Sequence, residues 1–226
     1  MDIIRSAMEM GLNQLSEHLA KEFLKGFGLP VTKEKRVSSL EEAKACIQEM
    51  GLPLVLKVDS PRIAHKTEKG LVITGIASEE ALKRSFEKLL AIHAPKKDEA
   101  VLVQEMVEGK RELAMGLIRD PQFGPCVMFG LGGIFLEVLN DVTFRVAPID
   151  MTDAVEMLGE IRAHKILGQV RGMPEANKEK LARMLVTLGE IGLNFPEIKE
   201  IDLNPVILRG SEPVIVDALI VLGGNL

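Results

Sequence analysis

The sequence is short of the features that mark secreted, membrane-spanning and nucleic-acid-binding proteins. It has two cysteines, Cys46 and Cys126, in apolar surroundings and no C-x-x-C pair, so buried reduced thiols are expected. A net charge of -5 gives no overall positive field for nucleic acid. Residues 1–18 hold no continuous apolar run, which argues against a signal peptide or membrane span. These features predict a cytoplasmic protein that does not bind membranes.

The rest of the composition is that of a globular chain. Of its 226 residues, 46% are hydrophobic, which is enough to bury a core. Helical and strand patterns are mixed in both halves, which favours two α+β lobes over one doubly wound sheet. We predict an N-terminal helix within residues 1–30 that packs on the larger lobe. A small lobe at 31–100 and a large lobe at 101–226 would then be divided near the polar stretch 94–99.

Periodicity and capping signals place the individual elements. Ser39 and Glu42 form a capping-box pattern for a helix that Gly51 ends, and Ser78 caps the next helix. Further helices are expected at 152–167 and 177–193, and strands at 31–37, 54–58, 71–76, 101–106, 112–118, 141–148, 198–208 and 213–221. The last two strands form a closing hairpin.

The segment LVLKVDSPRIAHKTEKG, residues 54–70, joins an apolar strand to a basic loop. Lys57 lies between apolar residues, so its ammonium needs a partner, and a phosphate oxygen is suited to that role. The alternative is an edge-strand lysine that limits aggregation. His65 is mostly neutral near pH 7 and can attack a phosphoryl group, unless it is simply an exposed loop residue. The segment therefore indicates phosphate binding, and an enzyme is the leading hypothesis.

The closing hairpin contains a candidate metal site. Asp202 and Asn204 are two residues apart and therefore point to the same face of their strand. If the turn is centred between Gly210 and Ser211, Asn204 pairs with Asp217, and their β-carbons come within about 5 Å. Carboxylate and amide oxygens suit magnesium. The alternative, a hairpin with solvent-facing polar residues, is weakened by the apolar residues around Asp217.

Two other segments are candidates for contacts with a nucleotide or a phosphoryl group. The strand at 104–106 and Glu112 after it can present groups to an adenine and ribose, although any hairpin has this pattern. The glycine cluster 130–133 is followed by Glu137 and Arg145. The glycines are either simple turn formers or part of a site in which the arginine faces a transferred phosphoryl group.

Taken in order, these segments resemble the β subunit, an ATP-grasp domain, of ADP-forming acyl-CoA synthetases, of which the acetyl-CoA enzyme is the usual example. More distantly the chain looks like the nucleotide-binding half of succinyl-CoA synthetase. The resemblance covers about residues 12–222 and rests on four segments: LVLKVDSPRIAHKTEKG, VLVQEMVEGKRELAMG, RDPQFGPCVMFGLGGIFLEVLNDVTFRVAPID and EIDLNPVIL with VIVDA. One departure is that Gly70, Leu71 and Val72 stand where the family usually has two adjacent glycines before a valine.

The resemblance implies an ATP-grasp fold, an α/β fold whose two lobes clasp ATP or ADP with Mg²⁺. It implies that His65 carries a phosphoryl group, and the residue pattern after the glycine cluster adds Glu137 and Arg145 to the predicted catalytic set. The nucleotide-binding residues that it implies are Lys57, Gln104, Glu105, Met106 and Glu112. The basic loop and the glycine cluster add Lys66, Gly132 and Gly133 to that predicted set. The metal set that it implies is Asn204 and Asp217, with Asp202 adjacent.

The resemblance also implies a reaction sequence and a partner. Acyl-CoA and phosphate would give an acyl phosphate, then a phosphohistidine on a CoA-binding α subunit, then phospho-His65 and finally ATP. A heterotetramer is expected, since this chain lacks the glycine-rich CoA-binding domain. Two alternatives stay open. One is an ATP-grasp carboxylate ligase that works through an acyl phosphate, with His65 a bystander, and the other is a nucleotide-sensing module without turnover.

Overall fold

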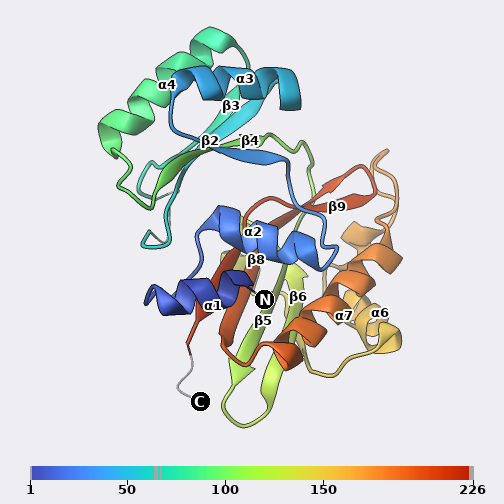
Figure 1. Ribbon diagram of the computed structural model, residues 1–226. Helices are drawn as coiled ribbons and strands as arrows, with labels where there is room; N and C mark the ends of the chain where they lie inside the picture. The colour runs from blue at the N-terminus through green and yellow to red at the C-terminus, as the bar shows by residue number, and fades with distance from the viewer. Residues whose placement is uncertain (1, 64–65, 67, 224–226) are drawn as a thin grey trace. The chain divides into compact units, whose positions relative to one another are not determined.

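Figure 1 shows a computed structural model of the chain, which describes residues 2–63, 66 and 68–223, without the side chains of Asp2 and Glu137. The chain divides into two compact units. The small unit consists of Gln14–Leu19 and Thr32–Met106, and the large unit of Met1–Asn13, Ala20–Val31 and Val107–Leu226.

The small unit is a four-stranded antiparallel sheet with two helices on one face (Figure 1). Its strands lie in the order β1 (Glu34–Val37), β4 (Ala100–Glu105), β2 (Leu54–Asp59) and β3 (Val72–Ile76). Its helices are α3 (Leu40–Met50) and α4 (Glu79–Ile92), which pack side by side. The core between sheet and helices is aliphatic apart from Phe86 and Cys46. Leu82 and Leu89 complete the buried face of α4, as the helical spacing predicts.

The predicted capping residues of α3 are confirmed in part. The Ser39 side chain accepts a hydrogen bond from the Glu42 backbone N–H, and Gly51 ends the helix with φ of 79°. The Glu42 carboxylate, however, accepts hydrogen bonds from the N–H and hydroxyl of Ser38. The reciprocal half of the capping box is therefore moved back by one residue.

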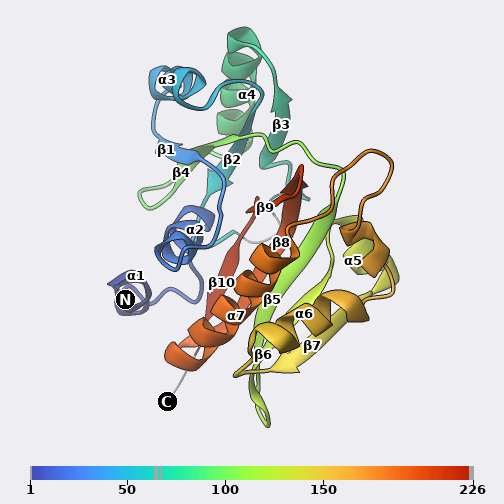
Figure 2. The same ribbon diagram turned by 90° about the vertical axis from the view of Figure 1, so that its right-hand side faces the viewer.

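The large unit contains an antiparallel sheet in the order β10, β8, β5, β6, β7, with β9 also paired to β8 (Figure 2). Its strands are β5 (Glu112–Asp120), β6 (Gly124–Leu131), β7 (Val142–Val146), β8 (Ile198–Arg209), β9 (Glu212–Ile215) and β10 (Leu219–Leu222). Helices α6 (Met151–Glu160) and α7 (Lys178–Asn194) pack on each other and against this sheet. The short helix α5 (Ile134–Leu139) begins directly after the glycine cluster and was not predicted.

The N-terminal segment forms two helices, α1 (Asp2–Glu9) and α2 (Glu17–Gly26), where one was predicted. The break follows from Gly11, which has φ of 70°, and from a second helix start after Ser16. Within the large unit, the ring of Phe23 on α2 and the ring of Phe27, directly after that helix, contact Phe195.

Other predicted boundaries also shift. We predicted that the large lobe begins at residue 101, whereas the units divide after Met106, because β4 pairs with both β1 and β2. The helix predicted at 152–167 ends at Glu160 and is followed by the 3-10 turn His164–Leu167. The carboxylate of Asp141 accepts hydrogen bonds from the backbone N–H groups of residues 162 and 163. These N–H groups therefore bond to a side chain instead of continuing the helix. The last predicted strand is divided into β9 and β10.

The two cysteines fit the expectation of reduced thiols. Cys46 and Cys126 are both free and buried, and burial raises the pKa of each thiol. No helix among residues 2–63, 66 and 68–223 is long and apolar enough to cross a membrane.

Candidate active site

Lys57 lies inside the small unit, at the centre of its sheet. Strand β2 is hydrogen-bonded to β4 on one side and β3 on the other, so the edge-strand alternative is wrong. The lysine is only 4% exposed, and its Nζ donates to Oε1 of Glu17 at 2.6 Å. The partner that a buried ammonium requires is thus a carboxylate from the first residue of α2.

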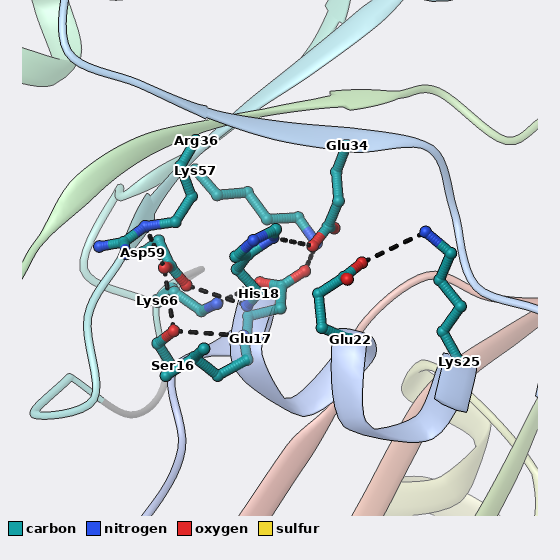
Figure 3. A network of polar contacts seen from close by, with 11 residues as sticks. Ser16, Glu17, His18, Glu22, Lys25, Glu34, Arg36, Lys57, Asp59 and Lys66 are labelled. Atoms are coloured by element: carbon teal, nitrogen blue, oxygen red, sulfur yellow. Dashed lines mark hydrogen bonds and ion pairs between the residues drawn. The ribbon is translucent and has the colours of Figure 1, made fainter. Parts of the chain in front are cut away.

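The same carboxylate also holds Lys66, whose Nζ donates to Oε2 of Glu17 (Figure 3). One buried anion therefore meets two cations, one from β2 and one from the basic loop. His65, the predicted nucleophile, lies outside the described residues, as do its neighbours 64 and 67. Lys66 follows His65 directly in sequence and is described, so its contact with Glu17 gives the position of one residue of the basic loop.

A second set of contacts surrounds this one and fixes the start of α2 (Figure 3). The buried carboxylate of Asp59 accepts hydrogen bonds from the Ser16 hydroxyl at 2.9 Å and from the His18 backbone N–H at 3.1 Å. Arg36 Nε lies 3.0 Å from the same carboxylate. The His18 ring contacts Glu34 Oε1 at 3.1 Å. A carboxylate at a helix N-terminus satisfies backbone donors and interacts favourably with the helix dipole.

The segment predicted to line an adenine pocket consists of the last two residues of β4 and Met106 directly after it. Gln104 is fully buried in the sheet, opposite Val55 of β2 and Glu34 of β1. The Glu105 carboxylate accepts the Lys33 backbone N–H at 2.9 Å. The Met106 N–H donates to the carbonyl of Pro53. These three residues are held by backbone pairing at the C-terminal end of the small unit.

In the large unit the predicted hairpin register is confirmed. Val206 pairs with Ile215, and Asp202 pairs with Leu219 on the far side of a short break in the ladder. The same register across this break puts Asn204 opposite Asp217. The alternation also holds, because Ile201 and Leu203 are buried in the core while Asp202 and Asn204 point to the other face and are half-buried.

The electrostatics of this hairpin favour a cation. Burial, with added repulsion from Glu200 and Asp217, raises the pKa of Asp202 from 3.8 to about 6. The strand register places Asp217 on the strand segment opposite Asn204, and its carboxylate is one of the two acidic groups that repel Asp202. A divalent cation between or beside them removes that repulsion, and Asn204 adds a neutral oxygen ligand. The residues present therefore fit Mg²⁺.

The set of protein ligands at this place is small. Among residues 2–63, 66 and 68–223 no group of three or more His, Cys, Asp or Glu side chains is arranged to hold a metal ion. Two carboxylates and one amide suit an ion that keeps several waters and binds the phosphates of its substrate, as Mg²⁺ does. They do not suit an ion that needs a closed cage of protein ligands.

Glu112 and the glycine cluster meet the hairpin at this place. The Gly133 N–H donates to Oδ1 of Asn204 at 2.9 Å, and the Gly132 N–H donates to the Glu112 carbonyl at 2.9 Å. A Cβ on Gly132 would collide with the carbonyl of Leu113, and one on Gly133, where φ is 59°, would collide with Oε2 of Glu112. Gly132 is therefore required by close backbone packing, and Gly133 by its positive φ beside Glu112 and Asn204.

Two predicted catalytic residues lie further along the same chain segment. Arg145 is on β7, and its guanidinium forms an ion pair with Glu160 of α6, which raises its pKa. Thr143, on the same face of β7, donates to the same carboxylate at 2.6 Å. Glu137 lies on α5, and its side chain is outside the described part of the chain. The contact with Glu160 orients Arg145, and its role in phosphoryl transfer stays a prediction.

Sequence reasoning missed Glu17. The residue stands in the first turn of α2, where an acidic residue is ordinarily explained by the helix dipole. Its partners lie 40 and 49 residues away in sequence, so no local pattern pointed to them. The available signal was the buried Lys57, which required an anion that the sequence analysis assigned to a phosphate.

Comparison with known families identifies the class. A family model described as an ATP-grasp domain matches residues 6–222, and the two antiparallel sheets with their packed helices agree with that assignment. The chain is 45% identical over 212 residues to the Acetate–CoA ligase (ADP-forming) I subunit beta of Pyrococcus furiosus, covering 92% of this chain and 91% of that one.

Further matches support the same assignment. This chain is 41% identical over 203 residues to the Acetate–CoA ligase (ADP-forming) I of Archaeoglobus fulgidus. The matched region is 88% of this chain but 30% of that longer protein. A more distant match, 23% identical over 209 residues, is the Succinate–CoA ligase (ADP-forming) subunit beta 2 of the same organism.

A solved structure gives the same result. The dinucleotide-forming acetyl-coenzyme A synthetase 1 of Ca. Korarchaeum cryptofilum superimposes with a TM-score of 0.87 at 42% identity, over 98% of this chain and 99% of that one. That protein was solved with coenzyme A and Mg-AMPPCP, with its phosphohistidine segment pointing towards the nucleotide binding site. The chain belongs to the ATP-grasp family and, within it, to the beta subunits of ADP-forming acetate–CoA ligases. The predicted family and fold class are confirmed.

Proposed function

We propose that this chain is the nucleotide-binding subunit of an ADP-forming acyl-CoA synthetase, which converts acyl-CoA, ADP and phosphate into free acid, CoA and ATP. The observation that carries the proposal is the meeting of Glu112, Gly133 and Asn204 beside the carboxylates of Asp202 and Asp217. Phosphoryl transfer needs chiefly positioning and neutralisation of charge, and this group can hold a metal–nucleotide complex.

Mg²⁺ and ATP or ADP are the cofactors of the proposed reaction. Asp202, Asn204 and Asp217 would hold the ion, which when bound neutralises charge on the nucleotide phosphates. Glu112 would contact the nucleoside, and the residues at 104–106 would line the adenine pocket. The backbone N–H groups of Gly132 and Gly133 already have acceptors in Glu112 and Asn204, so these glycines act by allowing close approach.

His65 would carry the phosphoryl group. Its neutral imidazole nitrogen attacks the phosphorus of a phosphohistidine on the partner, so that one N–P bond forms as another breaks. An oxygen of the β-phosphate of ADP then attacks the same phosphorus, which gives ATP and returns the imidazole to its neutral form. Lys57 and Lys66 would supply positive charge to the phosphates, and Arg145 and Glu137 would act at the transferred group.

A CoA-binding partner chain is part of the proposal. The Pyrococcus relative is named as a beta subunit, and the Archaeoglobus relative is a chain about three times longer in which the matching region is 30% of the whole. The name of the first relative and the length of the second both support a further subunit or domain that carries the other functions of the enzyme. We infer a CoA-binding α subunit in a heterotetramer, acting in the cytoplasm.

The test is reconstitution with the partner subunit and the His65→Ala variant. Acyl-CoA-dependent ATP synthesis should fall by about 1,000-fold or more, because the nucleophile is removed, while Mg²⁺–ADP binding is retained. A variant that retains full synthetase activity would contradict the proposal and favour a carboxylate ligase. Wild-type protein that binds nucleotide but shows no turnover with the partner would favour a sensing module.

A further inference from the structure

Glu17 is a buried carboxylate that holds two lysines of the small unit at once. Its side chain is 1% exposed, and those of Lys57 and Lys66 are 5% and 12% exposed. Each carboxylate oxygen accepts from one ammonium. A carboxylate that bridges two ammonium groups keeps both within one short span, about the reach of a single phosphoryl group.

The backbone around Glu17 is fixed on both sides. The residue before it, Ser16, donates its hydroxyl to Asp59, and the residue after it, His18, donates its backbone N–H to the same carboxylate. Asp59 is fully buried and in turn lies 3.0 Å from Arg36 Nε on β1. The first turn of α2 is therefore anchored to the end of β2, the strand that carries Lys57 (Figure 3).

We propose that Glu17 is a positioning residue for phosphoryl transfer, which holds the ammonium groups of Lys57 and Lys66 together so that they act on one phosphoryl group. The proposal rests on the function proposed above and extends it to a residue that the family resemblance did not assign. Without Glu17, Lys57 and Lys66 would lose the carboxylate that they share, so their ammonium groups would no longer be held to one common point.

The test is the half-reaction of the full-length chain alone, in which γ-labelled ATP with Mg²⁺ transfers phosphate to His65. The variant is Glu17→Gln, which keeps the shape of the side chain but has one acceptor oxygen and cannot accept from both lysines. At saturating ATP we expect the labelling rate to fall by about 10- to 100-fold. The matched control is Glu22→Gln on the same helix, whose exposed ion pair with Lys25 is 3.4 Å long.

Equal labelling rates for Glu17→Gln and Glu22→Gln, in folded protein, overturn the positioning role, as does a faster rate for Glu17→Gln. Wild-type chain that takes up no label contradicts the proposed function itself, so the two failures are distinguishable. If Glu17→Gln does not fold, Glu17→Asp replaces it, because it keeps the charge but is too short to reach both lysines. An unchanged rate in that variant likewise contradicts the inference.

A double-mutant cycle separates positioning from a purely structural role. If Glu17 acts through Lys66, adding Lys66→Met to Glu17→Gln reduces the labelling rate by clearly less than the product of the two single losses. Independent effects that simply multiply would show that Glu17 does not act through Lys66. Circular dichroism of each variant confirms that the rates refer to folded chains.

Discussion

The small and large units gather charged side chains in opposite ways. In the small unit, Lys57 and Lys66 share the carboxylate of Glu17, so unlike charges are already paired. In the large unit, Asp202 and Asp217 approach each other, and the pKa of Asp202 rises to about 6. Paired charges need no ligand to remain buried, whereas like charges favour a cation. The charged groups of the small unit are thus preorganised, whereas those of the large unit would be stabilised by a bound cation.

Glu99 is a second buried carboxylate of the small unit that is surrounded by hydrogen-bond donors. Burial disfavours its charged form, but hydrogen bonds from the Lys96 N–H at 2.9 Å, His93 at 2.8 Å and Ser60 at 2.7 Å lower its pKa to about 2. A buried carboxylate with donors is thus ionised well below neutral pH. Asp202 is buried beside other acids and shows the reverse shift.

The largest effect in this comparison is expected from Asp217→Asn. Losing one carboxylate ligand should weaken Mg²⁺-dependent ADP binding by about 100-fold or more. With Mg²⁺ chelated, the same variant should be more stable than wild type, because the repulsion between Asp217 and Asp202 is removed. Isothermal titration with and without Mg²⁺, and urea unfolding in EDTA, measure the two changes.

The control for this variant is Asp98→Asn, which alters an exposed carboxylate paired with Arg62. Its ADP affinity should match that of wild type. Unchanged affinity in Asp217→Asn with Mg²⁺ present would show that the hairpin does not hold the ion, and the contrast between the two units would then be lost.

A smaller effect is expected from Glu99→Gln. The folded pKa of about 2 lies below the ordinary value of 4.5, so this carboxylate stabilises the fold above pH 4.5. That contribution is lost as the pH falls from 4.5 through 2. The substitution should lower the free energy of unfolding by about 2 kcal/mol at pH 7 and by much less near pH 2.5.

Urea unfolding at several pH values checks this expectation, with Glu87→Gln as control. Glu87 is exposed on α4 and pairs weakly with Lys83 at 4.0 Å, so its replacement should change stability by less than about 0.5 kcal/mol. A destabilisation by Glu99→Gln that does not shrink in acid would mean that its hydrogen bonds do not favour the ionised form.

The sequence predicted the large-unit site better than the small-unit one, for a physical reason. The pairing of Asn204 with Asp217 follows from the period of a strand and a turn at Gly210, which has φ of 64°, and both are local properties. The partner of Lys57 depends on where Glu17 lies within the small unit, which no local pattern encodes. The sequence could show that Lys57 needs an anion, but not that Glu17 supplies it.

The errors in the fold have the same origin. Helix α5 has six residues and begins after Gly133, so it is too short for a periodic signal and has no side-chain cap. The end of α6 depends on Asp141, which comes from a different segment and takes two backbone donors. The strands and longer helices were predictable because their patterns repeat within the element.

We propose that the acidic site of the large unit and the basic loop of the small unit serve one phosphoryl transfer. The most direct measurement is labelling of the wild-type chain with γ-labelled ATP, followed by mapping of the label. We predict one acid-labile, base-stable phosphate on His65 that forms with Mg²⁺ and does not form in EDTA. Label on another residue, or no label in the presence of Mg²⁺, would contradict this claim.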